Sequence, residues 1–157
     1  MTQSVTRKMR FRVKHGIFVE RQPDEVFAFV ADVDNSPKWQ STLFDVNDRA
    51  DVNNGQLQAR ARVRDARNVL GKKLDVEWQV IDFEPGKRMT MEVVKGAPVY
   101  WKMTFEVEPV DGGTYLTGEG GGDLGEIGIP PAAFSRSCQH LLENDLATLR
   151  DILEKTG

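Results

Sequence analysis

The segment FRVKHGIFVERQPDEVFAFVADVDNSPKW (residues 11–39) changes its hydrophobic period once, and this change decides the fold class. From Phe11 to Val19, apolar and polar side chains largely alternate, which is the two-residue period of a half-buried strand. Pro23 begins a different pattern, because proline suits the first turn of a helix, and two acidic residues and an apolar helical face follow it. We predict a strand, a helix that begins at Pro23, and a second short helix around residues 35–39.

Alternation returns after this segment and continues to about residue 124, with turns rich in glycine, proline and asparagine between the runs. The runs predict further strands over residues 43–51, 57–68, 73–83, 87–95, 98–109 and 113–124. Because the connections are short enough for hairpins, neighbouring strands are expected to be antiparallel. With the first strand, they predict a sheet of seven strands.

A helical spacing of apolar residues replaces the alternation after Pro130 and Pro131. The stripe recurs at steps of four or three residues and comprises Phe134, Cys138, Leu142, Leu146, Leu149 and Leu153. About 23 residues at about 1.5 Å per residue reach roughly 35 Å, which is long enough to cross the sheet. We therefore predict an α+β fold in which a seven-stranded antiparallel sheet wraps around a long C-terminal helix, with two short helices after the first strand.

Length and composition limit the classes of function. The 157 residues fit one folded domain over residues 11–157, preceded by an N-terminal arm over residues 1–10. The 21 basic residues do not exceed the 24 acidic ones, so we expect no nucleic-acid partner. There is no run of 18 apolar residues, and we expect neither a signal peptide nor a membrane span. A single cysteine favours the reducing cytoplasm.

The predicted inner face of the sheet is rich in tryptophan and methionine. Methionine adapts to varied apolar shapes, so this face suits either a packed core or a pocket that accepts a ligand. The same face of the last strand carries glycines, which contribute no volume, and this favours a cavity. The helix from about residue 134 is expected to close it. The expected ligand-binding residues are His15, Trp78, Met89, Met91, Trp101, Met103, Phe105, Gly118, Gly120 and Phe134.

No catalytic or metal-binding set of residues is expected. Cys138 and His140 are two residues apart on a helix and point to different faces, so they do not form a nucleophile and base pair. One cysteine and two histidines on separate elements lack the spacing of a zinc site. We therefore assign no catalytic residue, no metal and no cofactor.

A few polar residues occupy strand positions that the alternation predicts to face inward, as the apolar residues do. His15 is either a hydrogen-bonded core histidine or a polar group that orients a ligand inside the cavity. Asp65, Arg67 and Asp82 lie near the ends of strands and are expected at the rim. If the substrate carries a phenol, an enol or a carboxylate, His15 or Arg67 could fix it.

The chain resembles the START-like, or SRPBCC, superfamily over about residues 11 to 155. The resemblance is carried by the glycine and proline turns, the glycine-rich last strand, the amphipathic terminal helix, and the motif Pro23-x-x-Val26-Phe27-x-x-Val30-Ala31-Asp32 followed by Asn35-x-Pro37-x-Trp39. It implies the helix-grip fold, with a cavity between the sheet and the C-terminal helix. Among the members of the superfamily, the chain is most similar to the bacterial group of polyketide cyclases, dehydratases and lipid transport proteins.

Three functions follow as expectations. The first is binding or transport of a small hydrophobic ligand, such as a lipid, a polyketide or an isoprenoid-like molecule, by a cytoplasmic protein. The second is a polyketide cyclase or dehydratase that uses the same cavity. The third is a non-catalytic interaction module with a filled core. For the first two we expect a cavity of a few hundred Å³, the usual scale of ligand sites, and a space for no more than a water or two would contradict both. A monomer and a dimer are equally compatible with the sequence.

Overall fold

The computed structural model describes residues 10–50, 55–69, 71–95, 100–123 and 130–155. The expected arm over residues 1–10 lies outside them except for Arg10. The elements within these ranges are β1 (Phe11–Val19), α1 (Pro23–Val30), α2 (Ser36–Trp39), β2 (Leu43–Ala50), β3 (Arg62–Val69), β4 (Lys72–Glu84), β5 (Arg88–Lys95), β6 (Tyr100–Val110), β7 (Gly113–Asp123) and α3 (Pro131–Lys155). None of these helices is long and apolar enough to cross a membrane.

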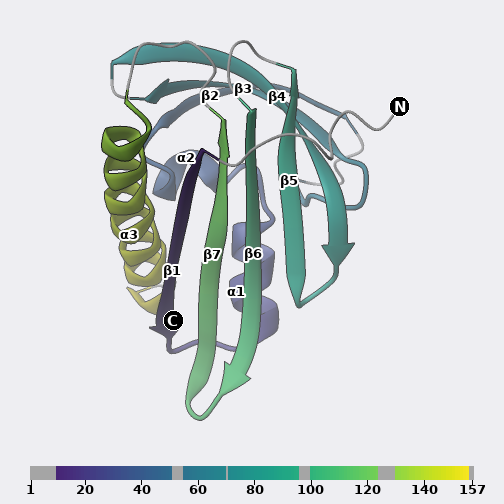
Figure 1. Ribbon diagram of the computed structural model, residues 1–157. Coiled ribbons are helices and arrows are strands. Elements are labelled where there is room, and N and C mark those ends of the chain that lie inside the picture. Colours follow the sequence, from purple (N-terminus) through teal and green to yellow (C-terminus); the bar gives the residue numbers. More distant parts are fainter. Residues whose placement is uncertain (1–9, 51–54, 70, 96–99, 124–129, 156–157) are drawn as a thin grey trace.

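The strands described form one antiparallel sheet in the order β1-β7-β6-β5-β4-β3-β2. The sheet is strongly curved, α1 lies behind it in the view of Figure 1, and α3 runs along β1. Strands β2 to β7 follow one another as a meander, and β1 joins the free side of β7. The predicted α+β helix-grip architecture, with two short helices after the first strand and a long C-terminal helix, is confirmed.

Side chains of α3 bind the backbone of β1, which is an edge strand. The Gln139 amide accepts a hydrogen bond from the Lys14 N–H at 3.0 Å and donates one to the Lys14 carbonyl oxygen at 2.8 Å. Ser135 donates to the Arg12 carbonyl oxygen at 3.1 Å, and Glu154 accepts the N–H of Glu20 at 2.9 Å. These bonds fix α3 against the sheet and therefore fix one wall of the space between them.

The third strand is shorter than predicted. It begins at Arg62, whereas the alternation predicts a start at residue 57. Arg60 has a φ of +69°, and its N–H donates to the Val80 carbonyl oxygen, so the chain turns there before it enters the strand. Leu57 is still buried, but its N–H bonds the carbonyl oxygen of Ala31 at the end of α1. The alternation therefore identified the buried side chain and assigned it to the wrong element.

Candidate functional site

A cavity of about 120 Å³ lies between the inner face of the sheet and the helices. Its wall includes all three tryptophans of the chain, Trp39 of α2, Trp78 of β4 and Trp101 of β6. The remaining lining residues are mostly aliphatic side chains and methionines, together with a small set of polar side chains from α2 and the α2–β2 connection, from β3 and from α3. The volume is smaller than the few hundred Å³ that the sequence predicts.

The structure brings six of the ten predicted ligand-binding residues to this wall. They are Trp78, Met89, Met91, Trp101, Met103 and Phe105. The other four lie elsewhere among the residues described, and they are His15, Gly118, Gly120 and Phe134. The alternation therefore identified the large lining side chains on β4, β5 and β6, and the departures are confined to β1, β7 and α3.

The glycines of β7 do not leave open space beside them. A Cβ atom added at Gly118 would lie 3.0 Å from Cε1 of Phe105 and 3.1 Å from Cδ1 of Leu142. A Cβ atom at Gly120 would meet the Lys102 carbonyl oxygen and the side chain of Met103. Absent side chains on β7 thus allow neighbouring side chains to approach its backbone. The space that the sequence interpretation expects to be empty beside these glycines is therefore filled.

Phe134 and His15 stay outside the cavity for different reasons. Phe134 is fully buried and packs edge-on against Phe11 and Trp101, with ring centroids 4.8 and 5.7 Å apart. Phe134 therefore packs against Trp101, which lines the cavity, without lining the cavity itself. His15 is half-buried on β1 opposite Gly118 and does not line the cavity.

One end of the cavity is polar. The Arg67 guanidinium binds both carboxylate oxygens of Asp65, at 3.2 Å from Nε and 3.1 Å from Nη2. It also donates to Gln40 Oε1 at 2.8 Å and to Thr42 Oγ1 at 3.3 Å. It lies over the ring of Trp78, whose indole N–H donates to Asp65 at 3.4 Å. The carboxylate and the guanidinium therefore neutralise each other within a hydrogen-bonded network.

The rim position predicted for these polar residues is wrong in two ways. Asp65 is 3% exposed, and both it and Arg67 line the cavity itself. Asp82 lies on the outer surface and forms an ion pair with Arg88 at 2.8 Å. The register of β4 and β5 shifts between Val80 and Asp82. After this irregularity, the residues that strict alternation would turn inward face outward.

Asp145 of α3 also lines the cavity, and the sequence interpretation missed it. The Ser41 N–H donates to its Oδ1 at 3.1 Å. Burial raises the pKa of Asp145 above its ordinary value, and the bonds from Ser41 and the charge of Arg67 offset part of this effect. Its spacing was an available signal, because Asp145 follows Cys138 by seven residues and shares its side of the helix.

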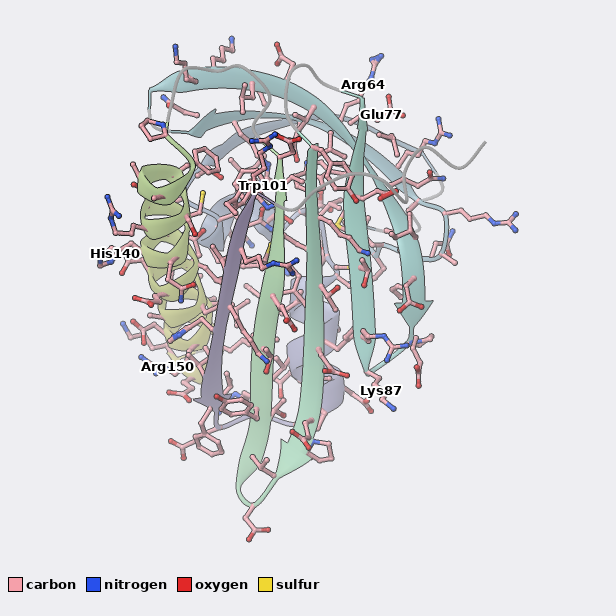
Figure 2. The ribbon with its side chains drawn as sticks, viewed as in Figure 1. Arg64, Glu77, Lys87, Trp101, His140 and Arg150 are labelled. Carbon is pink, nitrogen blue, oxygen red and sulfur yellow. The ribbon has the colours of Figure 1, made fainter. Side chains whose placement is uncertain are left out.

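Neither the cysteine nor His140 provides a catalytic group at the cavity. Cys138 is buried on the wall, and burial raises the pKa of its thiol to about 12, so the thiol is protonated at neutral pH. Figure 2 shows His140 on the outer side of α3, pointing away from the sheet, and it is exposed. No cluster of three or more potential metal ligands occurs among the residues described.

Two of the lining tryptophans have unsatisfied donors. The indole nitrogen atoms of Trp39 and Trp101 are buried and have no acceptor among the residues described. A buried N–H without an acceptor is rare in native interiors and is costly in free energy. The wall of this cavity therefore contains more unpaired hydrogen-bond donors than an ordinary core does.

The chain is similar in sequence to one protein family and in fold to several solved structures. A family model described as polyketide cyclase/dehydrase and lipid transport matches residues 10–154. No curated protein matches the chain. Solved structures match its fold closely. A START superfamily protein from Mycobacterium smegmatis has a TM-score of 0.78 at 15% identity, and TTHA0849 from Thermus thermophilus has 0.76 at 16%. Each match covers 93% of this chain and 99% of the other.

Proposed function

Because the chain belongs to the polyketide cyclase/dehydrase and lipid transport family, within the START-like superfamily, we propose that it binds a small hydrophobic molecule in the cavity between the sheet and α3. The observation that carries the proposal is the cavity itself, with its three tryptophans and its polar end. The aromatic rings supply a large apolar contact area, and the polar groups supply orientation.

The size of the cavity supports ligand binding over a filled core. Protein interiors have few voids larger than a water molecule, and a water needs only about 10–15 Å³ of such space. A volume of about 120 Å³ exceeds this need several-fold. It is close to the roughly 150 Å³ of an engineered apolar cavity that binds benzene. We therefore propose a ligand whose buried part is about the size of one ring.

An enzyme of the cyclase or dehydratase type is the second candidate. It is favoured by the Asp145 carboxyl group, whose pKa is raised by burial at the cavity wall. A carboxyl group at the wall of a cavity can act as a general acid or base toward a bound molecule. Turnover of a retained molecule by the purified protein, lost in Asp145→Asn, would distinguish an enzyme from a carrier.

Native mass spectrometry of protein purified from its own cells tests the proposal. We expect a non-covalent adduct that disappears on denaturation and is missing from protein that has been unfolded and refolded in buffer. A second readout is the fluorescence of the tryptophans, which should change when the refolded protein takes up an apolar probe. Absence of an adduct together with an unchanged fluorescence would contradict ligand binding.

A cytoplasmic location is part of the same proposal. The one cysteine of the chain is a buried free thiol, which is compatible with a reducing compartment. Fractionation of the native cells should recover the protein with the cytoplasmic markers.

A further inference from the structure

The charges at the polar end of the cavity are unequal in number. The Asp65 carboxylate and the Arg67 guanidinium form one closed pair. Arg67 gives its further hydrogen bonds to Gln40 and Thr42, so its donors are directed toward protein acceptors. Asp145 contributes a second carboxyl group to the same wall. The ionised site therefore carries an excess of one negative charge.

The Asp145 carboxylate retains capacity to accept hydrogen bonds. Among the residues described, Ser41 donates hydrogen bonds to it from its N–H, at 3.1 Å, and from its side chain. A carboxylate has about four lone-pair sites on its two oxygens and has no donor when it is ionised. Where a ligand displaces water from this half-buried carboxylate, the remaining sites favour a ligand that supplies an N–H or O–H donor.

We infer that the cavity selects an uncharged ring compound that bears a hydroxyl group, which donates its hydrogen to the Asp145 carboxylate, and that it rejects the corresponding carboxylate. The inference rests on the proposed function and names the ligand class for that site. A ligand carboxylate would place a second anion beside Asp145 while the Arg67 charge is already paired, and like charges repel strongly in a low dielectric. The ring would lie against the tryptophans of the wall.

An ammonium group would also meet a negative site, but it loses far more hydration than a hydroxyl group on entering the cavity. For this reason we assign the hydroxyl compound. A ring compound with an ammonium group is included in the test, because tight binding of it would contradict this assignment.

Four ring compounds of similar size test the inference at pH 7. They are p-cresol, p-xylene, p-toluate and 4-methylbenzylammonium, which differ in the group at one position of the ring. Affinity is measured by calorimetry, and occupancy by the indole N–H resonances of the ¹⁵N-labelled protein, since every tryptophan lines the cavity. We expect p-cresol to bind roughly 10-fold or more tightly than p-xylene, as for a hydrogen bond to a charged acceptor. The toluate and the ammonium compound should bind at least 10-fold more weakly than p-cresol.

Asp145→Asn keeps the shape of the side chain and removes its charge. In this variant, the preference for p-cresol over p-xylene should fall, and toluate should bind more tightly than in the parent. Asp151→Asn is the matched control, because Asp151 is an exposed aspartate on the same helix. It should leave all four affinities unchanged.

The outcomes separate the inference from the proposed function. Toluate or the ammonium compound binding as tightly as p-cresol, or p-xylene equalling it, would overturn the inference while ligand binding stands. An Asp145→Asn protein that folds and keeps the parental ranking would also overturn it. If none of the compounds shifts an indole resonance, the proposed function itself fails at this cavity. Should the variant not fold, the ranking by the parent protein decides.

Discussion

Asp65 and Arg67 stand two residues apart on β3, on the same face of the strand, and meet in a two-point ion pair inside the cavity wall. The two charges neutralise each other, and both side chains also form hydrogen bonds to neighbouring groups, so the pair holds those groups in position. Trp78 donates to the carboxylate and lies under the guanidinium, so the pair also sets the orientation of one aromatic wall.

Removal of one member of this pair should destabilise the protein strongly. Arg67→Met leaves the Asp65 carboxylate buried without its counter-charge, which costs roughly 3–5 kcal/mol in comparable pairs. Urea unfolding at pH 7 measures this change. The double variant Asp65→Asn with Arg67→Met should recover a large part of the loss. Equal stabilities of the parent and Arg67→Met would contradict a structural role for the pair.

Enlargement of Gly118 should be costly because Phe105 and Leu142 occupy the adjacent space. Gly118→Leu forces both side chains to move, and overpacking of this kind costs roughly 1–3 kcal/mol or more. Gly118→Ala is the matched control and should cost less, since its neighbours need to shift by only a small distance. Chemical unfolding checks both variants. A Leu variant as stable as the parent would show that open space exists there.

The Cys138 thiol should be unreactive in the folded protein. Burial raises its pKa from 9.0 to about 12, so the thiolate is scarce at pH 8 and shielded from reagents. Iodoacetamide at pH 8 should label the protein in urea and leave the native protein unlabelled, as read by mass spectrometry. Rapid labelling without urea would mean that the thiol is accessible.

The same thiol predicts a loss of stability in alkali. Because the pKa is higher in the folded state than in the unfolded state, the contribution of Cys138 is fully present below pH 9.0 and is lost as the pH rises toward 12. The stability difference between the parent and Cys138→Ala should therefore shift against the parent over this interval. A difference that is independent of pH would contradict the raised pKa.

Asp145 predicts a dependence of stability on pH that has the same sign as that of Cys138 but begins at lower pH. Its pKa is raised in the folded state, so ionised Asp145 disfavours folding at pH 7, and the penalty vanishes below its unfolded value of 3.8. Asp145→Asn should have a higher Tm than the parent at pH 7, and this gain should disappear at pH 3.5. A variant that is less stable than the parent at pH 7 would contradict the desolvation of this carboxyl group.

The period of the apolar residues was sufficient to predict the elements and most of the large lining side chains. It failed where the backbone departs from regular pairing. The shift between Val80 and Asp82 moved Asp82 to the surface, and the turn at Arg60 shortened β3. Such irregularities come from tertiary contacts, which a two-residue period does not encode.

The polar end and the volume of the cavity could not be predicted from the sequence, for a further reason. Asp145 lies on the apolar side of α3, but a single acidic residue in such a stripe gives no indication of which polar groups it meets. The space beside Gly118 depends on how Phe105 packs across β7, and the pattern of the strand says only that a side chain is missing there. Cavity volume is set by three-dimensional packing.

The bonds from Ser135 and Gln139 to the backbone of β1, and from Glu154 to the residue that follows it, have a consequence for self-association. An edge strand with free N–H and C=O groups is a template for pairing with another copy of the chain, and here helix side chains occupy several of those groups. Outward movement of α3 to admit a bulkier ligand would break these bonds and uncover the edge. Because α3 covers both the cavity and this edge, any opening of the cavity by movement of α3 would also expose a strand edge that can pair with another copy.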